Sequence, residues 1–122
     1  MSRDPKEGEH YLLSFPSKYL RGVDLQPPEG EEVEVEVTIS RVEVGAEVHK
    51  NEGGKEVIES RIVVHFDGKD KALILNKTVG KEIQRFLGTP AMDKWKGKTI
   101  RLYTKWGKWF GVYQPAIRVR TK

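Results

Sequence analysis

The clearest pattern in the chain is a strict alternation of apolar and polar side chains over residues 32–39. The apolar positions are Val33, Val35, Val37 and Ile39, and the intervening positions are Glu32, Glu34, Glu36 and Thr38. A period of two predicts a strand with one buried face and one exposed face. After Ser40 and Arg41 the apolar phase slips by one residue to Val42 and Val44, which is typical of a β-bulge that bends the strand. We therefore expect a long, bent strand over residues 32–44, with the bulge within residues 39–42.

Two further strands are expected at residues 58–66 and 71–75. The intervening stretch 45–57 contains Asn51-Glu52-Gly53-Gly54, which predicts a flexible loop tip. A four-residue loop at 67–70 would set Val64 opposite Leu73 and Ile62 opposite Leu75, whereas a two-residue Asp67-Gly68 turn would set Val64 opposite Lys71. Burial of apolar pairs favours the longer loop.

The period changes after Asn76 and predicts a helix over residues 77–87. Val79, Ile83, Phe86 and Leu87 fall on one face, with Lys81, Glu82 and Arg85 away from it. Asn76 or Thr78 can cap its start and Gly88 suits its end. One more helical turn is expected within 91–95, with Trp95 filling the core.

The last two strands are expected at residues 98–104 and 108–120, joined by a hairpin around Trp106-Gly107. The element order is that of an OB-fold-like five-stranded barrel, mainly β, with one helix between strands three and four. An SH3-like barrel or an α+β roll has the same element count and remains an alternative. Residues 1–31, with four of the six prolines, are expected to form an arm that packs on the barrel domain of residues 32–122.

Charge is distributed unevenly between the two halves of the chain. Residues 1–59 hold 7 Lys and Arg against 14 Asp and Glu, a net charge of −7, while residues 60–122 hold 15 against 4, a net charge of +11. A basic half attracts polyanions such as nucleic acid. A thermophile-like surface rich in Lys and Glu is the other interpretation.

The sequence carries no recognisable catalytic or metal-binding pattern. There is no cysteine, the three histidines are scattered, and no Walker loop or GxSxG is present. No apolar run approaches the length of a membrane span, and the N-terminus is polar. These features predict a cytoplasmic protein that is not an enzyme, with no cofactor, no metal and no membrane association.

The richest chemistry lies where aromatic side chains and cations alternate. Cations track phosphates and aromatic rings stack on bases when a protein holds a single strand without reading its sequence. Trp106, at the expected hairpin tip, is the aromatic residue that a core role explains least. The candidate nucleic-acid-binding residues are Arg61, Lys77, Arg101, Tyr103, Lys105, Trp106, Lys108, Trp109, Phe110, Arg118 and Arg120. Arg61, Arg101, Arg118 and Arg120 are expected to share a basic sheet face.

Several segments occur in an order that resembles a family of small, largely uncharacterised proteins of tailed bacteriophages. The segments are Ser17–Leu20 with Asp24-Leu25, Val35–Val42, Leu73–Thr78 (LILNKT), Trp95–Lys98 with Ile100–Tyr103, and Ala116–Arg120 (AIRVR). The resemblance spans roughly residues 17–120, and the family usually has Asn where Val79 stands here. It implies a viral gene product, in the host cytoplasm, near replication and recombination genes.

Together these observations predict a non-enzymatic, sequence-tolerant single-stranded DNA-binding protein of viral replication or recombination, with RNA as another ligand of the same chemistry. The alternative is an OB-like or SH3-like module that docks on a viral replication or virion protein. Strong salt dependence of binding would favour the first function, because each phosphate contact releases counterions.

Overall fold

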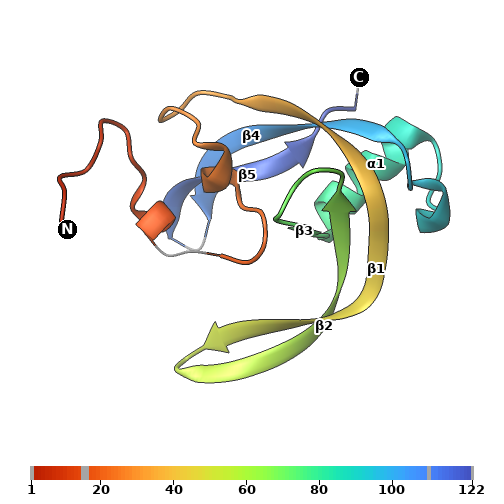
Figure 1. Cartoon of the computed structure of the whole chain (residues 1–122), viewed down its shortest axis with the longest axis horizontal. Coiled ribbons are helices and arrows are strands. Elements are labelled where there is room, and N and C mark those ends of the chain that lie inside the picture. The colour runs from red at the N-terminus through yellow and green to blue at the C-terminus, as the bar shows by residue number, and fades with distance from the viewer. Residues whose placement is uncertain (1, 15–16, 110, 122) are drawn as a thin grey trace.

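The computed structural model describes residues 2–14, 17–109 and 111–121 and has one antiparallel sheet with a single α-helix (Figure 1). The strands are β1 (Glu34–Glu52), β2 (Lys55–Phe66), β3 (Leu73–Ile74), β4 (Thr99–Trp109) and β5 (Val112–Val119). The helices are α1 (Lys77–Leu87) and three short 3-10 turns, η1 (Tyr11–Ser14), η2 (Gly22–Leu25) and η3 (Met92–Lys94). The sheet order is β3-β2-β1-β4-β5, with α1 between β3 and β4 in sequence. The predicted mainly β, OB-like arrangement is confirmed.

The sheet is not closed into a full barrel. β3 and β5 are its two edges, and among the described residues no ladder joins them. Part of the N-terminal arm lies in this open seam. Tyr19 forms a parallel bridge with Ala72 beside β3, and the Leu20 N–H donates to the Ala72 carbonyl over 2.8 Å. Gly22 approaches β5 so closely that a Cβ there would lie 2.2 Å from the Pro115 carbonyl oxygen.

The bend in β1 allows one strand to serve two partners. Residues Glu34–Thr38 pair with β4, and the strand pairs with β2 from Ile39 onward. The register shifts between Ile39 and Arg41, which confirms the predicted bulge. A second shift, between Glu43 and Ala46, was not predicted; Gly45 sits there with φ +80°.

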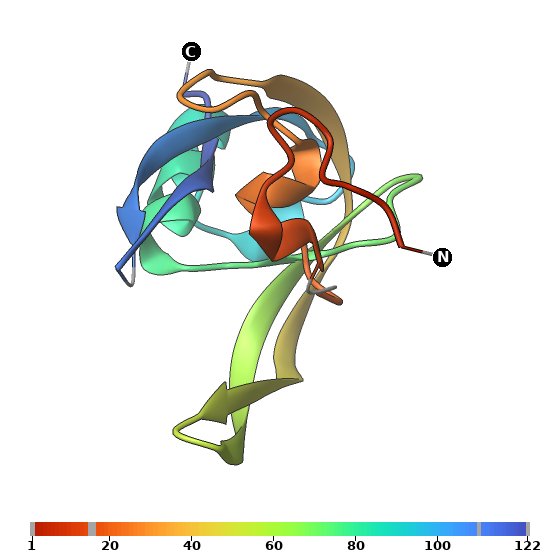
Figure 2. The same ribbon diagram turned by 90° about the vertical axis from the view of Figure 1, so that its left-hand side faces the viewer.

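The β1–β2 hairpin is much longer than predicted and projects from the rest of the molecule (Figures 1 and 2). Residues 45–57 were expected to form a loop, and this is wrong, because only Gly53-Gly54 turn the chain. In this part of β1 the alternation continues, with a polar residue after each of the apolar Ala46 and Val48. They are buried with Val63 and Ala72, in a small apolar cluster separate from the main core.

The main core lies between the curved sheet and α1. Ile39, Ile100 and Leu102 from the sheet meet Val79 and Ile83 from the helix, and all five are at most 1% exposed. Val37 is also buried, Val35 is half-buried against this core, and Glu34 and Glu36 are exposed, as their alternation predicts.

The helix begins and ends where the sequence predicts. The Asn76 side chain accepts from the Val79 N–H over 2.8 Å, and Gly88 ends the helix in the left-handed region. Trp95 is buried, and its Nε1 donates to the Thr89 carbonyl over 2.9 Å. The longer β2–β3 loop is also confirmed, since Val64 pairs with Leu73.

The β4–β5 hairpin turns later than predicted. β4 continues through Trp106-Gly107 and pairs up to Trp109 opposite Val112, so the predicted turn at Trp106 is wrong. Gly107 lies inside the strand, where a Cβ would come within 2.6 Å of the Trp109 ring. Pro115 lies within β5 opposite Trp106. Proline has no N–H to donate, and β5 tolerates it because, on an edge strand, the N–H of an outward-facing residue has no partner strand to bind.

Candidate nucleic-acid interface

The predicted binding residues fall into three places rather than on one face. The first place is the outer face of β4 and β5, with the residue just after β5. It holds Arg101, Tyr103, Arg118 and Arg120. Lys105, Trp106 and Lys108 lie further along β4, towards its hairpin with β5. Arg61, Lys77 and Trp109 lie around the open seam between β3 and β5. Phe110 lies outside the described residues.

The outer face of β1, β4 and β5 is neutralised by acidic side chains of β1. Glu36 stands opposite Arg101 in the ladder, with 3.8 Å between the Arg101 Nε and a Glu36 carboxylate oxygen. Arg120 donates to Glu34 over 3.0 Å and also binds Glu32. Its guanidinium lies 3.8 Å from the centre of the Tyr103 ring. We call this surface, made of Glu34, Glu36, Arg101, Tyr103, Arg118 and Arg120, the paired-charge face.

Arg118 is held most firmly of these cations. It donates to both carboxylate oxygens of Glu82 in α1, over 2.9–3.2 Å, and this hydrogen-bonded ion pair raises the pKa of the guanidinium. Glu82 also accepts from the backbone N–H of Val119 over 3.1 Å. A phosphate would have to displace this carboxylate, so the expected open basic sheet face is wrong. Arg61 lies on the second strand, β2, as expected, but its guanidinium contacts Glu59 and the Leu75 carbonyl rather than the arginines of β4 and β5.

Trp106 makes contacts with the N-terminal arm and with β5. Its Nε1 donates to the Glu31 carbonyl over 2.8 Å, and its ring centroid lies 5.1 Å from that of Tyr113 and 6.0 Å from that of His10. The indole therefore joins the N-terminal arm to the β4–β5 hairpin. Lys105 and Lys108 beside it are exposed and form no ion pair with any described residue.

A groove of about 410 Å³ runs along the open seam, and we call it the seam groove. Its lining residues come from the arm, β3, the start of α1 and the β4–β5 hairpin. They are Leu20, Arg21, Gly22, Leu73, Ile74, Asn76, Val79, Trp109, Gln114, Pro115, Ala116 and Ile117.

One tryptophan lines this groove, and two cations lie near residues of its wall without lining it themselves. Trp109 is half-buried against Gly107, and its carbonyl accepts from the Gln114 side chain over 3.1 Å. The Arg61 Nη2 lies 3.5 Å from the carbonyl of Leu75, which stands in sequence between the lining residues Ile74 and Asn76, and its Nη1 is paired with Glu59 over 3.3 Å. Lys77 follows Asn76 and is exposed at the first position of α1. The seam groove thus combines an apolar wall and an indole, with positive charge nearby.

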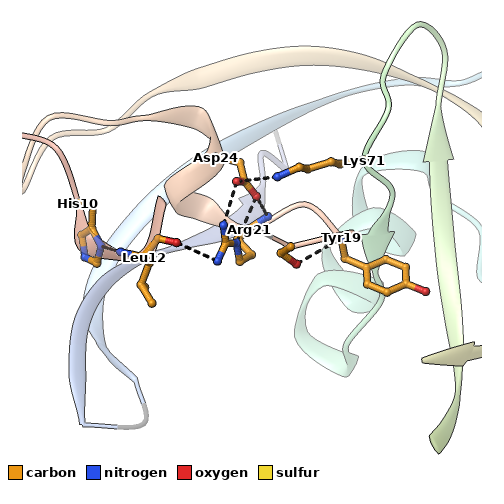
Figure 3. Close-up of polar contacts among 7 residues, drawn as sticks. His10, Leu12, Tyr19, Arg21, Asp24 and Lys71 are labelled. Atoms are coloured by element: carbon orange, nitrogen blue, oxygen red, sulfur yellow. Dashed lines mark hydrogen bonds and ion pairs between the residues drawn. The ribbon is translucent and has the colours of Figure 1, made fainter. Parts of the chain in front are cut away.

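A partly buried polar cluster holds the arm that forms one wall of the groove (Figure 3). Arg21 donates to the Leu12 carbonyl over 3.2 Å and to Asp24, and Lys71 reaches Asp24 over 3.0 Å. Burial opposes ionisation of Asp24, but hydrogen bonds from Arg21 and Lys71 outweigh it and hold the pKa of the carboxyl below its usual range. These contacts therefore hold this wall of the groove against the rest of the fold.

Sequence reasoning did not include two exposed basic residues of α1 among the candidate binding residues. Lys81 and Arg85 follow Lys77 at four-residue spacing on α1, and both are exposed. Their spacing was visible in the sequence, but they were assigned only to the polar side of the helix.

Among residues 2–14, 17–109 and 111–121, no cluster of three or more His, Asp or Glu side chains is arranged to hold a metal ion. Within the same residues no helix has the length and apolarity that a bilayer crossing needs. No protein-family model, curated protein or solved structure matches the chain.

Proposed function

We propose that this protein binds single-stranded DNA without catalysing a reaction, and that the seam groove receives bases. The observation that carries the proposal is the position of Trp109 in the wall of the seam groove, together with Asn76, which the exposed Lys77 follows directly. An indole presents a flat surface to any base, and cations beside it meet the backbone phosphates. The combination suits a ligand recognised by its chemistry and not by its sequence.

The topology supports the same location. In OB-folds, oligonucleotides bind on the face of strands two and three, between the loop after strand one and the loop after strand four. Arg61 lies on β2, Ile74 on β3, and Trp109 at the end of β4. Fold alone does not fix function, so the side chains of the groove must carry the argument. A role in viral replication or recombination rests on the sequence resemblance and stays a prediction.

Substitution of Trp109 tests the groove directly. Trp109→Ala should weaken binding of a fluorescently labelled oligo-dT by about 1–3 kcal/mol, the usual contribution of one base stack, with little change in the slope of log K against log salt. Trp109→Phe should retain part of the affinity. Gly107→Ala should also weaken binding, because its Cβ would push against the Trp109 ring. Fluorescence anisotropy measures all three.

A matched control is Tyr103→Ala, which removes an aromatic side chain from the paired-charge face. It should leave oligo-dT affinity unchanged. Equal losses for Tyr103→Ala and Trp109→Ala, or no loss for Trp109→Ala, would contradict the assignment of the seam groove.

The second candidate function is a protein-docking module. One observation favours it: Val44 and Ile58, on the projecting β1–β2 hairpin, are 67% and 56% exposed. Exposed apolar side chains on an extended hairpin are typical of protein contacts. Binding to a protein partner that persists at high salt, with no oligonucleotide binding at low salt, would favour this function.

A further inference from the structure

One face of α1 carries a row of cations that the fold leaves unneutralised. Lys77, Lys81 and Arg85 recur at four-residue spacing and are exposed, on the side of the helix away from Val79 and Ile83. No described residue forms an ion pair with any of the three. The only acidic side chain of the helix, Glu82, is bound to Arg118. We call these three residues the α1 row.

This arrangement is unfavourable for the free protein. Like charges four residues apart on a helix repel each other and destabilise it. The same molecule pairs its arginines with carboxylates on the paired-charge face, through Glu34, Glu36 and Glu82. The α1 row differs from that face, although Lys105 and Lys108 are likewise exposed without an ion pair to a described residue. An anionic ligand would remove the repulsion within the row.

The α1 row starts one residue after the groove wall, on the side of the helix away from Val79, which also lines the groove. A strand would therefore have to pass around the start of α1. Asn76 lines the groove, and Lys77 is the next residue. Successive cations of the row are about 6 Å apart along the helix axis, so from Lys77 to Arg85 the row extends about 12 Å. A chain of phosphates leaving the groove at Asn76 could follow this line with its bases turned away from the helix.

We propose that the α1 row binds the phosphodiester backbone of the strand whose bases occupy the seam groove, and so extends the binding site beyond it. This inference rests on the proposed function. The contacts are charge-assisted hydrogen bonds from two amines and a guanidinium to phosphate oxygens. They carry no base information, in agreement with a sequence-tolerant site. Each contact releases condensed counterions and adds to the salt dependence of binding.

The test compares two double variants of equal net charge. Lys81→Gln with Arg85→Gln neutralises the α1 row while keeping Lys77 at the groove. Lys55→Gln with Lys69→Gln neutralises two exposed cations at the hairpin tip and in the β2–β3 loop. Both proteins are titrated with labelled oligo-dT of increasing length over a salt series. Thermal unfolding without ligand checks the fold, and the row variant should be at least as stable as the wild type at low salt.

For the row variant we expect the slope of log K against log salt to fall by about 1.4, twice the single-strand value of about 0.7 per phosphate. The affinity gained on lengthening the oligomer should also be lost, while the shortest oligomers bind as before. The Lys55/Lys69 variant should keep the wild-type slope and length dependence.

Two results would overturn the inference while leaving the proposed function intact. One is a row variant that keeps the wild-type slope of log K against log salt and the wild-type length dependence, while the separate Trp109→Ala variant still binds more weakly. The other is a row variant that loses affinity for duplex DNA only. Failure of the wild-type protein to bind any oligomer would instead contradict the proposed function itself.

Discussion

Two tryptophans three residues apart in β4 have different environments. The Trp106 indole N–H is bonded to the Glu31 carbonyl, and its ring packs between His10 and Tyr113. Trp109 lies over Gly107 at the wall of the seam groove. Sequence alone favoured Trp106 as the contact residue, because the turn was expected at Trp106-Gly107, whereas β4 continues to Trp109 and β5 begins at Val112. The ladder up to Trp109 opposite Val112 reverses this preference.

Replacing Trp106 should therefore affect stability more than binding. Trp106→Ala removes a hydrogen bond worth about 1 kcal/mol and ring contacts worth about 0.5–1.5 kcal/mol each. We expect the free energy of unfolding to fall by about 2–4 kcal/mol in urea titrations, the sum of one hydrogen bond and two ring contacts. Trp106→Phe should recover the ring contacts and lose only the hydrogen bond. Unchanged stability together with lost oligo-dT affinity would return Trp106 to the binding site.

At the scale of elements, the N-terminal arm and α1 compensate for an incomplete barrel. The arm bridges to Ala72 beside β3 and contacts β5 through Gly22, so it occupies the seam that neither edge strand closes. Further along β5, the Glu82 carboxylate of α1 accepts a hydrogen bond from the backbone N–H of Val119 at the sheet edge. Both contacts satisfy or cover an edge that would otherwise be open to other strands.

The Asp24 cluster makes the attachment of the arm sensitive to acid. Because the pKa of Asp24 is lower in the folded protein than in the unfolded chain, its ionised form stabilises the fold. This contribution is complete above the unfolded pKa of about 3.9 and is lost as the pH falls through the folded value. Asp24→Asn should thus be less stable than the wild type at pH 7, and the gap should narrow below about pH 4.

Urea midpoints of both proteins at pH 7 and pH 3 measure this gap. A gap that stays the same at the two pH values would mean that the charge of Asp24 does not contribute to holding the arm.

At the scale of the whole molecule, the acidic and basic halves of the chain neutralise each other. β1 carries the glutamates and lies beside β4, which adjoins β5, so Arg101 and Arg120 meet Glu36 and Glu34 across the sheet. The net charge of +11 in the second half therefore does not by itself require a ligand. Among the described residues, the cations without an ion pair include the α1 row, Lys105 and Lys108.

The features that were predictable are those governed by neighbours in sequence. The alternation of Val37 and Ile39, the cap at Asn76 and the stop at Gly88 each follow from local chemistry. The partners of the arginines were not predictable in the same way. Arg118 binds Glu82, 36 residues earlier, and Arg120 binds Glu34, 86 residues earlier. Such pairs form only when the sheet brings distant residues together. The sequence alone therefore could not show which of the candidate cations are ion-paired and which are free.

The measurement that tests the central claim most directly is a titration of the wild-type protein with labelled oligo-dT, followed by fluorescence anisotropy over a salt series. If the seam groove and the α1 row hold a single strand, binding is strong at low salt. The slope of log K against log salt is then about −2.1, for three phosphates at Lys77, Lys81 and Arg85. The absence of any anisotropy change at tens of micromolar protein in low salt would contradict the account.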